Sequence, residues 1–196
     1  MTIWQEIRAG TIPSRLTVAD VYALTDAGML AENEHFDLID GEIVPMAAAK
    51  SSDHERVKQR LGRVLNLALP HEQGVFVEAE IAFGPSDLHE PDLAVWPAEI
   101  GSQDVRGPDL LLLIEVAVSS IGYDLRVKAP RYASFGVRDY WVVDAIRKTI
   151  RVHRAPVQGA YTQVEEYEAH DRVGALLLPS VSVCLAEIDG PAVRRW

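Results

Sequence analysis

The most constraining feature of the sequence is an apolar run, Leu110–Val118, that only Glu115 interrupts. A run of this length predicts a central β-strand that is covered on both faces. A carboxylate in such a strand loses much of its water, which is costly unless a cation, a metal ion or hydrogen-bond donors replace it. A second acid, Asp92, begins the preceding short apolar stretch, Leu93–Trp96. Two acids at positions where strands favour apolar residues suggest a metal site.

The overall composition favours one compact domain. The chain has 196 residues, of which 48% are hydrophobic, so we expect a single domain over residues 1–196. No apolar stretch approaches the roughly 18 residues that a membrane span needs, and the N-terminus lacks the pattern of a signal peptide. Cys184 is the lone cysteine and has no partner for an internal disulfide. We therefore expect a cytoplasmic protein that does not associate with membranes.

The formal net charge of −10 limits the nucleic-acid partners that the chain can have. It disfavours avid nonspecific adhesion to nucleic acid, because such adhesion needs Lys and Arg to neutralise phosphates. It leaves room for a local basic surface. Basic residues cluster within 56–63, 126–131 and 147–154, and the favoured interpretation of each cluster is an ordinary solvated face.

Hydrophobic periodicity and turn residues predict alternating helices and strands. We expect a helix after Thr17 that ends at Gly28, a β-hairpin around Asp40-Gly41, and a longer helix from Ser52 to about Leu69. Strands are expected at 75–83, 92–96, 110–118, 140–143 and 149–152, with further short strands within 161–167 and 176–183, a loop at 97–108, and a helix from Ser119-Ser120 toward Phe135. This order predicts one α/β domain with a mixed sheet.

The two acids are expected to meet at one end of a strand pair. If the strands on either side of the 97–108 loop are antiparallel, the start of the first strand lies beside the end of the second, which brings Asp92 close to Glu115. Unpaired carboxylates at this separation repel each other, and a divalent cation removes the conflict. Oxygen ligands of this kind suit Mg²⁺ or Mn²⁺. Glu80, in the preceding stretch, is a candidate third ligand whose placement depends on strand register.

The helix that follows Glu115 contributes a candidate amine. Asp124 and Lys128 are four residues apart and therefore neighbours on one helix face. Because this helix begins at the end of the carboxylate strand, its first turns can lie over the site. Lys128 would then hold or activate a water molecule for attack on a phosphate.

Each of these residues also has an ordinary structural interpretation. Glu115 can pair with an interior arginine, and Asp92 can cap the start of its strand. Asp124 and Lys128 can form a surface salt bridge, which contributes a few tenths of a kcal/mol. His54 can be a partly exposed helix histidine. The joint pattern and its topology favour the catalytic interpretation over these separate ones.

The order of motifs resembles a known family of nucleases. Pro91-Asp92 followed by Glu115 at the end of an apolar strand resembles the PD-(D/E)xK nuclease superfamily, and most of the chain is similar to the Uma-type restriction endonucleases within it. The motifs that carry the resemblance are Phe36–Glu42, Ser52 with His54, Glu90–Val95, Ile114–Val116 with Ser119-Ser120, then Asp124, Lys128 and Tyr132, and finally Asp139–Asp144.

The resemblance implies a restriction-endonuclease-like core: a mixed β-sheet flanked by helices, with an N-terminal helix and hairpin and extra C-terminal strands. It also implies Mg²⁺-dependent phosphodiester hydrolysis and a homodimer, with Asp92 and Glu115 holding the metal. The usual superfamily lysine follows the acid by two residues, where this chain has Ala117. Lys128 matches the position from which this family supplies a substitute amine.

Three further positions bear on the resemblance. Glu42 and His54 match family positions and are expected at the edge of the site. Pro130 departs from the family pattern and is expected to kink the helix just beyond Lys128, because proline removes a helix hydrogen bond.

Three functions are compatible with the sequence. The leading hypothesis is a metal-dependent DNA endonuclease. An alternative is a nucleic-acid-binding or regulatory protein on the same fold, which Ala117 and the acidic balance favour. A third is an oligomeric interaction module with Tyr140, Trp141 and the C-terminal strands buried between subunits. A Walker-type loop, a dinucleotide-binding glycine loop and a nucleophile elbow are all missing from the sequence.

Overall fold

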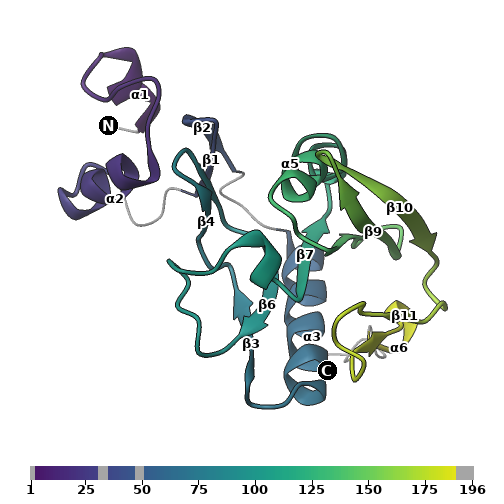
Figure 1. Cartoon of the computed structure of the whole chain (residues 1–196). Helices are drawn as coiled ribbons and strands as arrows, with labels where there is room; N and C mark the ends of the chain where they lie inside the picture. The colour runs from purple at the N-terminus through teal and green to yellow at the C-terminus, as the bar shows by residue number, and fades with distance from the viewer. Residues whose placement is uncertain (1–2, 31–34, 47–50, 189–196) are drawn as a thin grey trace, which may run out of the picture. The chain divides into compact units, whose positions relative to one another are not determined.

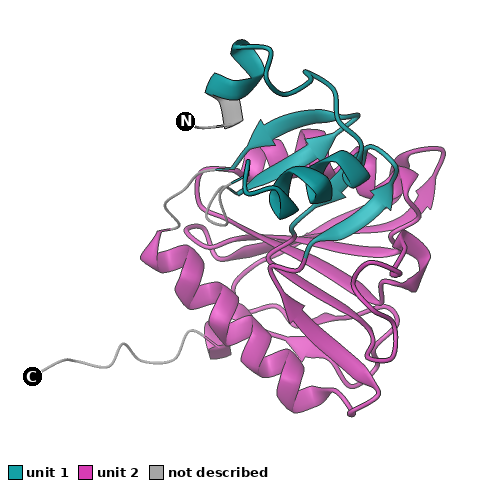
Figure 2. Ribbon diagram, turned by 90° about the vertical axis from the view of Figure 1, so that its left-hand side faces the viewer, with its two compact units in different colours: residues 1–49, 80–90 teal, residues 50–79, 91–196 magenta. Residues whose placement is uncertain are grey.

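The computed structural model describes residues 3–30, 35–46 and 51–188 of the chain. These residues fall into two compact units: residues 1–49 with 80–90 form unit 1, and residues 50–79 with 91–196 form unit 2 (Figure 2). The sequence predicts a single domain over residues 1–196, and this stays a prediction, because two compact units can belong to one domain or to two. None of the helices in the described ranges combines the length and the apolar character needed to cross a membrane.

Unit 1 contains two short helices and a four-stranded antiparallel sheet. The helices are α1 (Ile3–Arg8) and α2 (Val18–Asp26), and Thr17 caps α2 through a reciprocal capping box with Asp20. The sheet order is β2-β1-β5-β4, formed by β2 (Glu42–Pro45), β1 (Phe36–Ile39), β5 (Asp87–His89) and β4 (Ile81–Gly84).

The predicted hairpin of unit 1 is confirmed. Strands β1 and β2 pair antiparallel, with Ile39 opposite Glu42. The two turn residues, Asp40 and Gly41, have φ values of 48° and 79°, the left-handed conformation that a two-residue hairpin turn requires. The core of the unit consists of buried aliphatic residues from the helices, the connecting loops and the sheet: Ile12, Leu16, Val18, Val21, Leu30, Leu38, Ile43 and Leu88.

Unit 2 is built on a six-stranded mixed sheet. Its order is β10-β9-β8-β7-β6-β3, from β10 (Ala160–Tyr167), β9 (Thr149–Val157), β8 (Asp139–Asp144), β7 (Leu112–Ala117), β6 (Leu93–Pro97) and β3 (Gln73–Val77). Strands β7 and β8 are parallel, and the other pairs are antiparallel. The parallel pair requires a crossover, which the helical segment 121–134 supplies. This sheet and its helices confirm the predicted α/β class with a mixed sheet.

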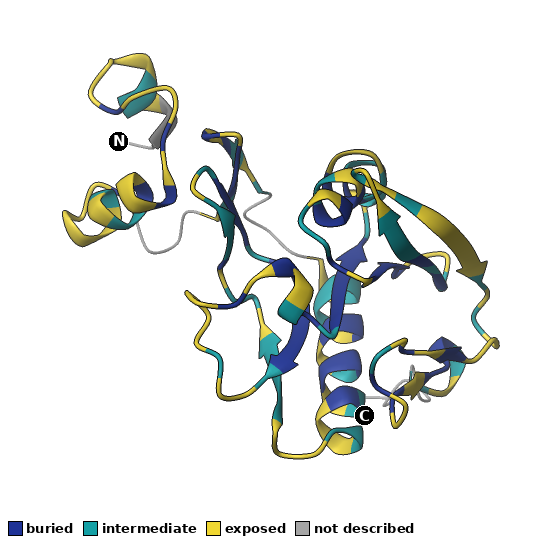
Figure 3. Cartoon of the chain, viewed as in Figure 1, coloured by how far each residue is buried: buried dark blue, intermediate teal, exposed yellow. Residues whose placement is uncertain are grey.

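The central strands are buried, as their composition predicts. Every residue of β7 and β8 is buried, and Figure 3 shows β7 in the colour of buried residues. The long helix α3 (Ser52–Ala68), which Ser51 caps, lies beside β7 (Figure 1). It contributes Val57, Leu61 and Leu65 to the same core as β6 and β7. Each such buried aliphatic side chain contributes about 1.5–3 kcal/mol. The helix thereby fixes the strands that carry Asp92 and Glu115.

The helical segment after β7 is not one regular α-helix. It consists of α4 (Ile121–Tyr123), a wider π-helical turn over Asp124–Lys128, and α5 (Ala129–Ser134). In the π turn, the Ala129 N–H donates to the Asp124 carbonyl, five residues back. Pro130 has no N–H to offer to the preceding turn, which accounts for the irregularity expected near Lys128.

The prediction of one strand over residues 75–83 is wrong. The chain forms β3 up to Val77 and β4 from Ile81, and these strands belong to different sheets. Glu78 breaks the run, because its φ of 51° is left-handed and incompatible with a continuous strand. Glu80 therefore lies outside any strand.

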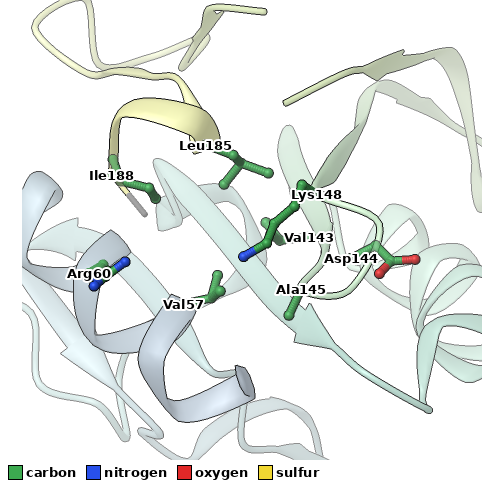
Figure 4. A pocket seen from close by; sticks show the side chains of 8 residues that line it. All are labelled: Val57, Arg60, Val143, Asp144, Ala145, Lys148, Leu185 and Ile188. Carbon is green, nitrogen blue, oxygen red and sulfur yellow. The ribbon is translucent and has the colours of Figure 1, made fainter. Parts of the chain in front are cut away.

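The C-terminal part of unit 2 contains small elements that close one side of the core. Strands β11 (Val173–Gly174) and β12 (Ser182–Val183) form a two-stranded sheet, followed by α6 (Leu185–Ile188). Elsewhere in unit 2, Gly107–Asp109 form a short 3₁₀ turn that precedes β7. A small hollow lies where α6 approaches α3 and the end of β8 (Figure 4). Its lining residues are Val57, Arg60, Val143, Asp144, Ala145, Lys148, Leu185 and Ile188.

Candidate active site

The antiparallel pairing of β6 with β7 places two acids at the same end of the strand pair. Leu93 is the register partner of Ile114. Asp92, the residue before Leu93, therefore lies at the same end of the strand pair as Glu115, the residue after Ile114. The antiparallel arrangement expected from the sequence is confirmed. Both residues are nearly inaccessible, with Asp92 7% and Glu115 4% exposed. The hydrophobic strands thus hold two carboxylates inside unit 2.

Glu115 is hydrogen-bonded to two residues of the crossover segment. The Lys128 Nζ and the Tyr132 Oη each donate to Glu115 Oε1, both at 2.9 Å. Burial, together with the negative charges of Asp124 and Asp92, raises the pKa of Glu115 to about 8, although the charge and hydrogen bond of Lys128 lower it. The charged partner of Glu115 is therefore Lys128. The alternative interpretation of the sequence, in which Glu115 pairs with an interior arginine, is wrong.

Asp92 is held by a backbone amide and by a histidine. The Val116 N–H donates to Asp92 Oδ2 at 2.8 Å. The His54 Nε2 lies 3.0 Å from Oδ1 and 3.1 Å from Oδ2, so it faces both carboxylate oxygens. Burial alone would lower the pKa of His54, but the hydrogen bond and charge of Asp92, together with Glu55, outweigh burial and raise it. His54 is thus a direct partner of a candidate metal ligand.

Asp124 and Lys128 lie inside the unit and do not form a surface pair. Both residues are 3% exposed. The Ser120 Oγ donates to Asp124 Oδ2 at 2.8 Å, and the Tyr140 Oη donates to the Asp124 carbonyl at 3.2 Å. The interpretation as an ordinary exposed helix salt bridge is therefore wrong. Their buried positions leave Lys128 beside Glu115 as the amine of the site.

The position of the usual superfamily lysine is an interior one in this chain. Ala117 ends β7, is fully buried and has Asp144 of β8 as its register partner. Lys128 comes from a different element and still reaches Glu115. The structure therefore pairs the buried acid with an amine despite the substitution at 117.

Two predicted residues belong to unit 1. Glu42 is exposed and forms an ion pair with Arg15 at 2.9 Å. Glu80 is half-buried, and burial together with the charge of Glu90 raises its pKa. Their roles at the edge of the site and as third ligand stay predictions. Within residues 3–30, 35–46 and 51–188, no three or more His, Cys, Asp or Glu side chains are grouped so as to hold a metal ion.

The structure adds residues that the sequence argument did not assign to the site. Tyr132 belongs to the family pattern, and the structure places it in α5, where its hydroxyl donates to Glu115. Lys58 is 4% exposed and lies four residues after His54 on α3, where it contacts Glu55 and Glu78. Its spacing of four residues from His54 is the sequence signal for this placement, because residues four apart share one helix face.

The donor set fits a hard divalent cation that is held by two protein carboxylates. The negative charges of Asp92 and Asp124 both raise the pKa of Glu115, so added positive charge near these acids is favourable. Mg²⁺ keeps several waters and commonly takes one or two carboxylates together with phosphate oxygens. A cluster of three carboxylates is not needed for such a site.

Comparisons with known proteins identify the family. The family model Uma2, described as "Putative restriction endonuclease", matches residues 18–186. A solved structure from Anabaena variabilis, described as a putative nuclease belonging to DUF820, is similar with a TM-score of 0.68 and 18% identity, over 85% of this chain and 96% of that one. Curated protein sequences gave no match. The structural likeness supports the nuclease-like fold, and the family model covers both candidate acids, His54, Lys128 and Tyr132. The chain therefore belongs to the Uma2 family.

Proposed function

We propose that the chain is a metal-dependent endonuclease that hydrolyses phosphodiester bonds in DNA. The observation that carries the proposal is the buried arrangement of Asp92 and Glu115 at one end of adjacent strands, with the Lys128 amine 2.9 Å from Glu115. The descriptions of the family and of the similar solved structure support the nuclease class.

In this proposal, Asp92 and Glu115 would hold Mg²⁺ or Mn²⁺. When bound, the ion would supply positive charge to the phosphate oxygens and lower the pKa of a coordinated water. Tyr132 and Lys128 orient the Glu115 carboxylate, and the Val116 N–H donates to the Asp92 carboxylate. Metal-ligating carboxylates are themselves hydrogen-bonded in this way, which fixes their direction.

Lys128 has a second role in the proposal. Its ammonium group either orients the attacking water or stabilises the charge that develops on the scissile phosphate. Burial strengthens this effect, because an interior charge interacts across a lower effective dielectric than a solvated one. Lys128 would thus take the role of the superfamily lysine, which follows the acid by two residues where this chain has Ala117.

The test is cleavage of supercoiled plasmid DNA by the purified chain in Mg²⁺ or Mn²⁺. We expect cleavage that EDTA stops and that Glu115→Gln reduces by at least about 10²-fold, because the variant keeps the size of the side chain but loses its charge. Glu166→Gln is the control, since Glu166 forms an ion pair with Arg151 on the outer strands. Equal cutting by wild type and Glu115→Gln would show that the activity is a contaminant.

A second candidate function is binding of nucleic acid without cleavage. Ala117 favours it, because the usual amine of the superfamily is missing from the acid strand. Salt-sensitive DNA binding by a chain that does not bind Mn²⁺ would support this alternative. The same protein preparations therefore distinguish the two functions.

A further inference from the structure

Asp92 is held from several directions by residues of unit 2. Its carboxylate accepts a hydrogen bond from the Val116 N–H, and both of its oxygens face the His54 Nε2. Its backbone carbonyl accepts a hydrogen bond from the Glu78 N–H at 3.2 Å. The backbone and the side chain of Asp92 are thus held by α3, by β7 and by the residue that follows β3.

His54 is itself held by a chain of buried and half-buried charges. Its Nδ1 lies 3.1 Å from Glu55 Oε1, and the same oxygen accepts a hydrogen bond of 2.7 Å from the Lys58 Nζ. Lys58 also forms an ion pair with Glu78. The network runs from Glu78 through Lys58, Glu55 and His54 to Asp92.

The geometry of Glu78 indicates that this network constrains the backbone. Glu78 adopts a left-handed φ of 51°, which is unfavourable for a residue with a side chain. In this conformation its N–H bonds the Asp92 carbonyl, and its carboxylate bonds Lys58. Glu78 therefore ties the end of β3 to both Asp92 and α3.

We propose that His54 is a positioning residue that fixes the direction of the Asp92 carboxylate, and that Glu55, Lys58 and Glu78 act by holding His54 in place. This proposal rests on the proposed function, in which Asp92 holds the metal. A carboxylate accepts hydrogen bonds and does not donate them, so His54 Nε2 carries the proton of this contact. A nitrogen that faces both oxygens restricts rotation of the carboxylate about its Cβ–Cγ bond. Residues that orient metal ligands in this way affect metal affinity without touching the metal.

The test is calorimetric titration of Mn²⁺ into the full chain. Removal of a residue that orients a metal ligand typically weakens metal binding about 10–100-fold, and we expect this loss in His54→Ala. His54→Gln should keep most of the affinity, because its side-chain amide can still donate to Asp92. His71→Ala is the matched control, since His71 is an exposed histidine just beyond the same helix. Thermal unfolding of each metal-free variant separates loss of folding from loss of binding.

The possible outcomes separate this proposal from the proposed function. Equal Mn²⁺ affinity of wild type and His54→Ala would overturn the role of His54 and leave the metal site intact. A His54→Gln variant as weak as His54→Ala would also overturn it, because the hydrogen bond would then not be the cause. A wild type that binds no Mn²⁺ would overturn both proposals.

A second variant keeps the test available if the His54 variants do not fold. Glu55 is 38% exposed at its side chain, and Glu55→Ala removes the partner of His54 Nδ1 without touching Asp92. A weaker Mn²⁺ affinity in Glu55→Ala supports the network. An unchanged affinity contradicts it.

Discussion

At the scale of single residues, the candidate site consists of two buried acids, each of which accepts hydrogen bonds that offset the cost of its burial. Glu115 and Asp92 stood out because acids in apolar strands need partners, and the structure places partners around both. The contact of Tyr132 with Glu115 could not be predicted from spacing alone, because its helical turn follows a π turn that changes which side chains face the strand. The partners of Asp92 depend on where α3 crosses the sheet, which periodicity does not specify.

The Tyr132 hydroxyl gives a prediction about a single hydrogen bond. Tyr132 is fully buried and donates to Glu115, so Tyr132→Phe leaves a buried acid with one donor fewer. We expect Tyr132→Phe to lower the free energy of unfolding by about 1–3 kcal/mol, measured by urea denaturation of the metal-free chain.

Tyr161 provides the matched control for this substitution. Its hydroxyl is buried and has no hydrogen-bond partner within the part of the chain that the structure describes. Tyr161→Phe removes a hydroxyl that gains nothing from burial, so its free energy of unfolding should be unchanged or higher. A loss of stability in Tyr161→Phe as large as in Tyr132→Phe would contradict the assigned role of the Tyr132 hydrogen bond.

At the scale of elements, capping residues and turn chemistry predicted where helices and the hairpin begin and end. The left-handed conformation of Glu78 and the π turn could not be predicted in this way. Thr17, Asp40-Gly41 and the start of α3 lie where local hydrogen bonding and allowed φ values place them. The run 75–83 alternates like one strand, but the left-handed Glu78 divides it. That conformation is stabilised by contacts with Asp92 and Lys58, which are distant in the sequence and not encoded in the alternation.

The π turn gives a prediction about an element. Pro130 cannot donate to the Arg126 carbonyl, and the chain forms the wider bond from Ala129 to Asp124. Pro130→Ala restores a donor, so we expect the segment to relax toward a regular α-helix and turn Lys128 away from Glu115. Plasmid cleavage should fall by about tenfold or more, which corresponds to about 1.4 kcal/mol, while the melting temperature stays the same or rises.

The control for this variant is Pro108→Ala, in the 3₁₀ turn that precedes β7. It removes a proline from another helical turn and should leave the cleavage rate unchanged. If Pro130→Ala cleaves DNA as fast as the wild type, the width of the turn is not needed to place Lys128.

At the scale of the whole molecule, the α/β class and the mixed sheet could be predicted, but the division into two units could not. The order of helices and strands predicts the α/β class, but it does not predict that β4 and β5 pair with the N-terminal hairpin in a sheet of their own. The composition changes little along the chain, and the break at Glu78–Glu80 carries no Gly- or Pro-rich linker. A boundary within an alternating apolar run therefore has no local signal.

Global stability should depend on pH through His153 of β9. Burial lowers the pKa of His153 to about 4, from an ordinary value near 6.5 in the unfolded chain. Between these values the unfolded state binds more protons than the folded state, so stability falls as the pH falls from about 6.5 to about 4. Above pH 6.5 both states are neutral at this residue, and the stabilisation is complete.

His153→Phe isolates this contribution, because phenylalanine keeps a ring beside Tyr140 and Tyr161 but cannot take up a proton. After allowance for solvent screening, we expect the wild type to lose about 2 kcal/mol more than His153→Phe between pH 7 and pH 4.5, measured by urea denaturation in EDTA. The exposed His170 supplies the control, since His170→Phe should keep the pH dependence of the wild type. Parallel pH profiles for the wild type and His153→Phe would contradict the lowered pKa, because a histidine that titrates alike in both states contributes nothing to the slope.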